Sequence, residues 1–214
     1  MLAISLDGRL APASGGAVQL GGPGDRRVLE EALAWADGCL IGANTLRLHG
    51  STCLIHAQDL LADRQAQGRS AQPLAIAVSR SGDLPIDLPF FSQPLERWLL
   101  HAALEPQARQ LDPVAAFARC LPLTSWSLAL EALAEAGLQR LVVLGGAQLA
   151  GSLLQADCID ALQLTVCPVL LGGPYSWLAA AAVLPDGLTG WRCEQHQLLG
   201  GDELVLRYVR DRAA

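Results

Sequence analysis

The chain has 214 residues, a hydrophobic content of 51% and a formal net charge of −6. This length and hydrophobic content are enough for one sizeable α/β core. Its basic residues are scattered, which argues against a nucleic-acid groove or an anionic membrane surface as partner. Apolar runs fall short of the roughly 20 residues of a membrane span, and the N-terminus lacks the basic region of a secretory signal. We expect a cytoplasmic, single-domain protein over residues 1–214 that acts on small molecules.

The cysteines and histidines do not predict a metal site. The six cysteines show no C-x-x-C or Cys/His pairing at ligand spacing, and most lie in apolar runs, where a thiol behaves as a small hydrophobe. The four histidines carry no accompanying carboxylate cluster. We therefore expect reduced, structural thiols and no bound metal, with a nucleophilic cysteine as the minor alternative.

Short apolar runs alternate with helical patterns along the chain, which is typical of a mostly parallel sheet flanked by helices. An apolar strand precedes Asp7, and a helix with Val28, Leu29, Ala32, Leu33 and Ala36 on one face leads into a strand at 39–41. Further strands are predicted at 73–78, 96–101, 141–144, 160–169 and 204–209. Ser125 or Ser127 can cap a helix with apolar positions Leu130, Leu133 and Leu138 and a left-handed stop at Gly137.

The segment from 141 to 169 predicts a strand, a Gly-Gly turn, a helix at 147–156 and a second strand, which together form a βαβ crossover. The segments 11–24 and 79–94 are rich in glycine, proline and small polar residues, and we expect them to be loops. Long loops in compact domains often bind ligands or form lids.

Three segments are candidates for ligand binding. Gly42-Ala43-Asn44-Thr45 follows a strand, where glycine allows close approach, Asn or Thr can cap the next helix, and free amides favour an anion. Gly145-Gly146-Ala147-Gln148-Leu149 follows another strand in the same way. Two such turns at strand carboxyl ends form a crevice of the kind that binds cofactors, although neither matches G-x-G-x-x-G.

The third segment is Ser5-Leu6-Asp7-Gly8-Arg9-Leu10-Ala11. It is either a simple Asp-Gly turn or a site in which Asp7 and Arg9 face the crevice, Arg9 being suited to a phosphate or a polar heterocycle. His49, just after the first glycine turn, is either a proton donor or an exposed loop residue.

These segments, in this order, resemble the reductase domain of the bifunctional riboflavin-biosynthesis deaminase/reductase. The matching stretches are SLDGRLA (5–11), ADGCLIGANTLR (36–47), VSRSGDLP (78–85) and LVVLGGAQLAGSLLQADCIDALQLTVCPVLLGG (141–173). The resemblance implies the dihydrofolate-reductase-like α/β fold, a homodimer, and hydride transfer from NADPH to the ribosyl C1′ of 5-amino-6-(5-phosphoribosylamino)uracil, which opens the sugar to the ribityl product.

The resemblance also implies roles for single residues. NADPH contacts carry over to Gly42, Asn44, Thr45, Gly145, Gly146, Ala147 and Leu149, with Ser79 and Arg80 placed for the adenosine 2′-phosphate. Substrate contacts carry over to Ser5, Asp7, Arg9, Gln19, Arg27 and His49, with Asp7 as the catalytic residue. Hydride transfer demands mainly that nicotinamide and acceptor be held together and water excluded.

The chain departs from the family pattern in three places, of which the first two fall on the substrate side and leave the cofactor side intact. Leu144 replaces the usual Glu before Gly-Gly, His49-Gly50-Ser51 replaces an acidic Asp-Asp/Asn-Pro segment, and no deaminase zinc motif is present. Two alternatives therefore remain open, namely a reductase of another heterocycle and an NADPH-binding protein without catalysis.

Overall fold

The computed structural model describes residues 1–102, 116–179, 182–185 and 188–212. The chain forms two compact units, one of residues Met1–Leu29 and Gly145–Ala214 and the other of Glu30–Leu144. Helix α1 (Pro23–Trp35) contains the boundary between them. Among the described helices, none combines the length and apolar character of a bilayer-spanning segment.

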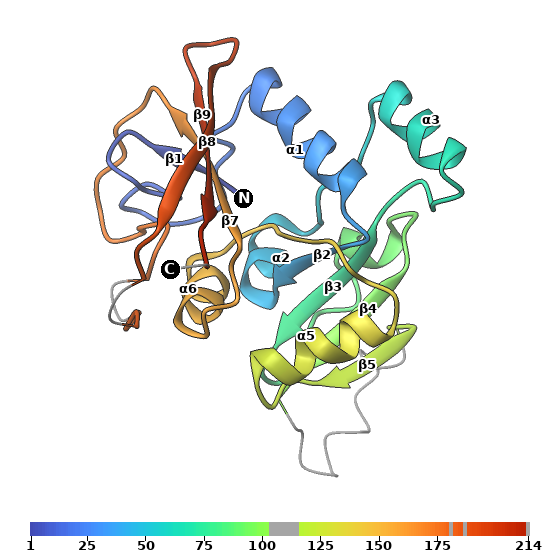
Figure 1. Ribbon diagram of the computed structural model, residues 1–214. Coiled ribbons are helices and arrows are strands. Elements are labelled where there is room, and N and C mark those ends of the chain that lie inside the picture. Colours follow the sequence, from blue (N-terminus) through green and yellow to red (C-terminus); the bar gives the residue numbers. More distant parts are fainter. Residues whose placement is uncertain (103–115, 180–181, 186–187, 213–214) are drawn as a thin grey trace. The chain divides into compact units, whose positions relative to one another are not determined.

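The unit of residues 30–144 is built on a five-stranded parallel sheet in the order β5-β4-β3-β2-β6 (Figure 1). The strands are β2 (Gly38–Gly42), β3 (Leu74–Ser79), β4 (Arg97–His101), β5 (Arg119–Pro122) and β6 (Leu141–Val143). Ala75, Ile76 and Ala77 of the central strand are fully buried, as expected for a parallel sheet covered on both faces.

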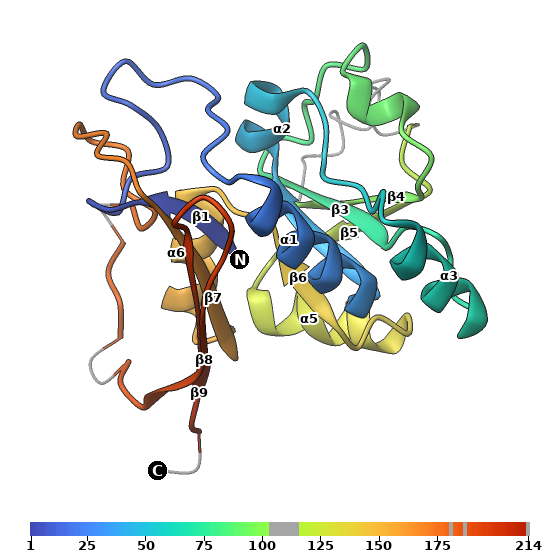
Figure 2. The ribbon, with the colours of Figure 1, turned by 90° about the horizontal axis from the view of Figure 1, so that it is seen from above.

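Helices cover both faces of this sheet because its crossovers run in two directions. The path from β2 through α2 (Ala43–His49) and α3 (Gln58–Ala66) to β3 moves toward one edge, whereas α5 (Trp126–Glu135) carries the chain back from β5 to β6. Right-handed crossovers in opposite directions place their helices on opposite faces. Figure 2 shows α2 and α5 on opposite sides of the strands.

The unit of residues 1–29 and 145–214 contains a four-stranded sheet in the order β1-β7-β9-β8. Strand β1 (Leu2–Ser5) pairs in parallel with β7 (Ala161–Cys167), and β9 (Leu204–Arg210) pairs antiparallel with both β7 and β8 (Trp191–Leu198). Helix α6 (Ala147–Gln155) buries Leu149, Leu153 and Leu154.

Local signals explain several element ends. Ser125 caps α5 by accepting the Leu128 amide, while Gly137 adopts φ +91° and the Leu138 amide donates to the Leu133 carbonyl, which is the Schellman arrangement. The prediction of this cap and this stop is confirmed. Leu138 itself lies past the helix end, so its assignment as a helical position was wrong.

A buried carboxylate starts α3, which sequence periodicity did not reveal. The N-cap residue of α3 is Ala57, which has no side-chain acceptor. Instead, Oε2 of Glu30 on α1 accepts the amides of His56 and Ala57, each at 2.8 Å, and Glu30 is only 5% exposed. This long-range cap satisfies amides that the local sequence leaves unpaired.

Several boundaries and one connection differ from expectation. Helix α1 begins at Pro23, inside the predicted loop, since proline is favoured in a first helical turn, and the 79–94 segment contains a 3₁₀ helix at Pro89–Ser92. The βαβ prediction for 141–169 is also wrong in one respect. β6 and β7 belong to different sheets, because β7 takes β1 and β9 as its hydrogen-bonded neighbours.

Candidate functional site

The strand order of the five-stranded sheet reverses between β2 and β6. The chain proceeds outward from β2 to β5, and then β6 returns to the other side of β2. In open α/β sheets, ligands bind outside the carboxyl ends of the strands at such a reversal. Gly42 ends β2 at this point, and Leu144 continues the β6 ladder by donating its amide to the Leu40 carbonyl at 2.9 Å. The reversal therefore marks a candidate cofactor site, and Gly145 follows it directly in the chain.

Helix α2 starts at the carboxyl end of β2 with Gly42 as its N-cap. Gly42 is extended and no side chain caps the helix, so the expectation that Asn44 or Thr45 would cap it was wrong. Both lie in the first turn, because the helix already starts at Ala43. Its first-turn amides lack intrahelical carbonyl partners and favour an anion. His49 is the last, exposed residue of this helix rather than a loop residue, one turn from Thr45.

The end of β3 forms a tight turn beside α2. Ser79 is buried and its Oγ accepts the Gly82 amide at 3.1 Å, with Gly82 at φ +71°. Arg80 is exposed between them. An Nη2 of Arg47 on α2 donates to the Asp83 carbonyl, which ties this turn to the helix. His101, the β4 register partner of Ser79, lies at the same carboxyl edge of the sheet. His101 was not predicted as a residue of this edge, although its position at the end of a predicted strand could have identified it as one.

In the other unit, Ser5, Asp7 and Arg9 form one hydrogen-bonded group. Ser5 Oγ donates to Asp7 Oδ1 at 2.6 Å and accepts the Arg9 amide at 2.8 Å. Asp7 also accepts the amides of Leu171, at 3.1 Å, and Gly172, at 2.8 Å, and lies 3.6 Å from Arg9 Nε. These bonds, that from Ser5 first, lower the pKa of the Asp7 carboxyl far below its usual range. Asp7 is therefore an anion that fixes the 171–172 backbone.

The Gly-Gly turn after β6 has the conformation that glycine permits. Gly145 adopts φ +86°, and a Cβ there would lie 2.7 Å from Leu2 Cδ2, so a side chain at this position is disfavoured. Gly146 is the N-cap of α6 and Ala147 its first residue. Leu149 is 6% exposed, so its side chain packs in the core. Any ligand contact of this segment comes mainly from backbone.

The remaining predicted substrate residues are exposed. Gln19 lies in the segment before α1, and Arg27 lies on α1. The hydrogen bonds of the described residues join Ser5, Asp7 and Arg9 and do not link Gln19 to them.

The sequence did not reveal an acidic pair formed by the half-buried Asp25 and the buried Glu203. Glu203 is 4% exposed, and its Oε1 accepts the Gly22 amide at 2.6 Å. Burial first, and then the nearby Glu203 charge, raise the pKa of Asp25 above its ordinary value. No sequence pattern joins these residues, because they come from opposite ends of the chain.

The two buried thiols do not have the properties of nucleophiles. No disulfide joins the six cysteines in this structure. Burial raises the pKa of Cys39 to about 12 and that of Cys167 to about 11, whereas reactive thiols have lowered pKa values. Cys39 and Cys167 therefore behave as the structural thiols that the sequence predicts.

Comparisons with known proteins agree with the fold and the family. Residues 1–204 match the model of the RibD C-terminal domain. The 2,5-diamino-6-ribosylamino-4(3H)-pyrimidinone 5′-phosphate reductase of Archaeoglobus fulgidus is 23% identical over 177 residues, which cover 80% of each chain.

Two solved structures share the fold over almost the whole chain. RibD of Acinetobacter baumannii matches with a TM-score of 0.76 and 20% identity over 98% of this chain and 56% of its own, so this chain spans little more than half of that protein. A pyrimidine reductase-like protein of Corynebacterium diphtheriae matches with a TM-score of 0.76 and 22% identity over 98% of this chain and 90% of its own.

These findings confirm the expected dihydrofolate-reductase-like α/β fold and the expected class of enzyme, a reductase of riboflavin biosynthesis. The match of the family model over residues 1–204 shows that the chain belongs to the RibD C-terminal domain family.

Proposed function

We propose that this protein is an NADPH-dependent reductase that opens the ribosyl ring of a ribosylaminopyrimidine 5′-phosphate to the ribityl product. The observation that carries the proposal is the family match over residues 1–204, on a sheet whose strand order reverses at β2 and β6. Such a reversal is where an α/β sheet binds a cofactor. NADPH supplies the hydride for C1′, and a proton from solvent or protein completes the hydroxyl of the opened sugar.

Two substrates differ only in the pyrimidine ring. The family resemblance points to 5-amino-6-(5-phosphoribosylamino)uracil, whereas the archaeal relative is named for the 2,5-diamino-4(3H)-pyrimidinone. Leu144 stands where the family usually has a Glu, so a polar contact from that position is absent. We propose that the chain accepts the uracil, as the resemblance implies, and the diaminopyrimidinone is the comparison substrate.

The proposed cofactor contacts lie on the carboxyl edge of the five-stranded sheet and on the turn that follows β6. The N-cap residue Gly42 and the first-turn amides of Asn44 and Thr45 suit the diphosphate. The exposed Arg80 after Ser79 suits a 2′-phosphate. The backbone of Gly145, Gly146, Ala147 and Leu149, in the other unit, supplies the remaining cofactor contacts that the family resemblance implies. A phosphate-binding Arg80 favours NADPH over NADH.

The proposed substrate contacts center on Arg9, with Asp7 as the residue that fixes its surroundings. Because Asp7 accepts three hydrogen bonds, forms an ion pair with Arg9 and has a lowered pKa, it remains ionised near neutral pH. It therefore acts by orienting Arg9 and the 171–172 backbone, and not by donating a proton. Gln19, Arg27 and the exposed His49 complete the proposed substrate contacts.

The test is a steady-state assay with purified protein, NADPH and each of the two pyrimidine substrates. We expect substrate-dependent loss of NADPH absorbance and a ribityl product by mass spectrometry. Folded protein that binds NADPH but turns over neither substrate would favour one of the two alternatives, a different heterocycle or a non-catalytic NADPH-binding protein. Leu144 and His49 are the observations behind those alternatives.

We further propose that the active form is a cytoplasmic homodimer, on the strength of the family resemblance. Light scattering coupled to size exclusion should give twice the mass of 22.6 kDa. A monomer with full activity would contradict the dimer while leaving the reductase proposal intact.

A further inference from the structure

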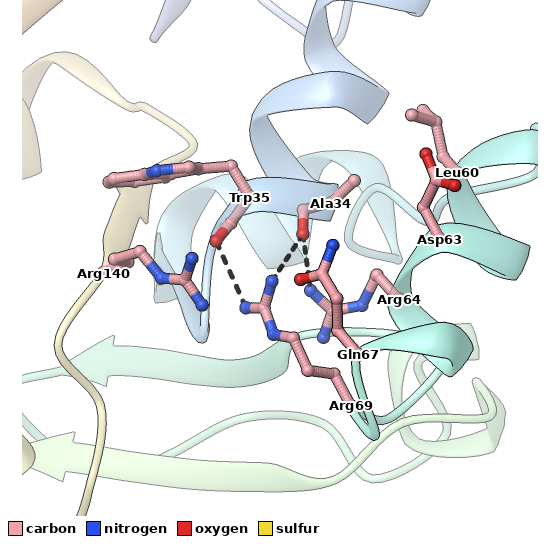
Figure 3. Close-up of a pocket in the computed structure, with 8 residues that line it drawn as sticks. All are labelled: Ala34, Trp35, Leu60, Asp63, Arg64, Gln67, Arg69 and Arg140. Carbon is pink, nitrogen blue, oxygen red and sulfur yellow. Dashed lines mark hydrogen bonds between the residues drawn. The ribbon is translucent and has the colours of Figure 1, made fainter.

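A hollow lies at the amino-terminal edge of the five-stranded sheet, away from the carboxyl edge described above. Its volume is about 210 Å³, and it is bounded by the end of α1, by α3 and by the residue that precedes β6 (Figure 3). Three arginines line it, namely Arg64, Arg69 and Arg140. All of them belong to the unit of residues 30–144.

The guanidinium groups share their partners. Arg64 and Arg69 both donate to the Ala34 carbonyl at 2.8 Å. Arg69 and Arg140 both donate to Asp37 Oδ1, at 2.8 and 2.9 Å. Figure 3 shows the Arg140 guanidinium below the Trp35 ring, with Arg69 and then Arg64 farther toward α3. Two of them thus cap the carboxyl end of α1, where a cation is favourable.

The hydrogen bonds that cap α1 do not neutralise the positive charge of the three arginines. Asp37 forms ion pairs with Arg69 and Arg140, and Asp63 on α3 is the acid among the described residues that line the hollow. Arg64 is only 3% exposed. Burial first, and then the Arg69 and Arg140 charges, lower the pKa of Arg64 to about 10, against the opposing effect of Asp37. A buried guanidinium next to two others is stabilised by an added anion.

Arg140 has donors left for such an anion. Within the described residues, its guanidinium makes one hydrogen bond, to Asp37, and lies 5.8 Å from the centroid of the Trp35 ring. Its side chain is 39% exposed. The planar fork of a guanidinium matches two oxygens of a phosphate, and Trp35 supplies an apolar wall.

We propose that this hollow binds the phosphate group of a small molecule, either free phosphate or a phosphate monoester. The volume of about 210 Å³ suits a small phosphate better than a drug-sized ligand, whose pockets start at about 300 Å³. The proposal is independent of the reductase function, since the hollow lies at the opposite edge of the sheet from the candidate cofactor site.

The test follows the Nε–H signals of Arg64 and Arg69 by NMR during titration with inorganic phosphate, with methyl phosphate and with acetate at constant ionic strength. A local signal is needed because the proposed cofactor and substrate sites also bind phosphates. We expect saturable shifts with phosphate and none with acetate. If methyl phosphate binds at least as well as inorganic phosphate, the ligand is a phosphate ester, and if only the inorganic ion binds, it is free phosphate.

Variants locate the effect. Arg140→Gln should weaken phosphate binding by at least about tenfold, the loss expected for a charge-assisted pair, and Arg140→Lys should weaken it less because the charge remains. Arg119→Gln is the matched control, because Arg119 also stacks on a tryptophan, 5.0 Å from the Trp98 centroid, and lies outside the hollow. Absence of saturable shifts in the wild type, or equal affinities of all variants, would overturn the proposal.

Discussion

Replacing Arg80 with glutamine tests the proposed selection of NADPH over NADH. Arg80 is exposed and follows Ser79, whose Oγ holds the Gly82 amide. A charge-assisted hydrogen bond to phosphate contributes about 1.5–3 kcal/mol. Because the side chain is in solvent and salt screens it, about 1–2 kcal/mol should remain, which is about 5- to 30-fold in Kd. NADH lacks the 2′-phosphate, so its Kd should change less than about twofold.

The assay is fluorescence titration of both dinucleotides with the wild type, Arg80→Gln and Arg119→Gln. Arg119 is also exposed and on the same sheet, so its replacement removes the same charge without touching the β3 turn. The reasoning is refuted if Arg80→Gln weakens both dinucleotides equally, or if Arg119→Gln weakens NADPH as much as Arg80→Gln does. Raising the salt concentration should reduce the difference between wild type and Arg80→Gln.

Other changes test the remaining assignments. Gly145→Val should abolish NADPH binding. Gly137→Val is the control, because Gly137 has a similar φ of +91° with open space around it, and this variant should still bind NADPH. An unchanged NADPH titration for Gly145→Val would place the cofactor elsewhere. Asp25→Asn should raise the Tm at pH 7 by about 2–4 °C, the shift for about 1 kcal/mol in a chain of this size. Because the folded pKa of Asp25 is raised, its stabilising neutral form is lost as pH rises, so the gain should disappear below about pH 4; a gain independent of pH would contradict this. Asp7→Asn should lower kcat/KM by about tenfold through loss of a charge-assisted contact. A wild-type activity that falls as pH rises, with an alkaline limb that Asp7→Asn abolishes, would instead make Asp7 a proton donor.

Elements with their own local signals could be predicted from the sequence. The strands at 39–41, 73–78, 96–101 and 204–209 all exist with shifts of one residue or so, because buried parallel strands are short apolar runs bounded by turn residues. The cap at Ser125 and the stop at Gly137 followed from side-chain chemistry that acts within four residues.

Elements that depend on distant partners could not be predicted. Strand β8 is mostly polar and exposed, and it exists through its pairing with β9. Helix α3 relies on Glu30, which lies 27 positions before Ala57. The arrangement of β6 and β7 in two sheets likewise depends on β1 and β9, which lie far from both in sequence.

The residues of the candidate site and of the hollow likewise fall into those that could be predicted from local sequence and those that could not. The glycine turns and the Ser5–Asp7–Arg9 group follow strands in sequence, so they could be predicted from spacing and from the family resemblance. The Asp25–Glu203 pair and the arginine hollow could not, because each assembles residues from separate segments. The carboxylate of Asp37, which follows α1 directly, was the visible part of the hollow, but its partners Arg69 and Arg140 lie 32 and 103 positions away.

The hydrogen bond from Arg47 to the Asp83 carbonyl has a thermodynamic consequence. It joins α2, proposed to hold the diphosphate, to the turn after β3, proposed to hold the 2′-phosphate. Immobilising either segment costs conformational entropy, and the tether makes the two segments share that cost. A ligand that orders one segment thereby lowers the entropic cost at the other. The two ends of the dinucleotide would then bind cooperatively, and the intact molecule would gain affinity that its separate halves lack.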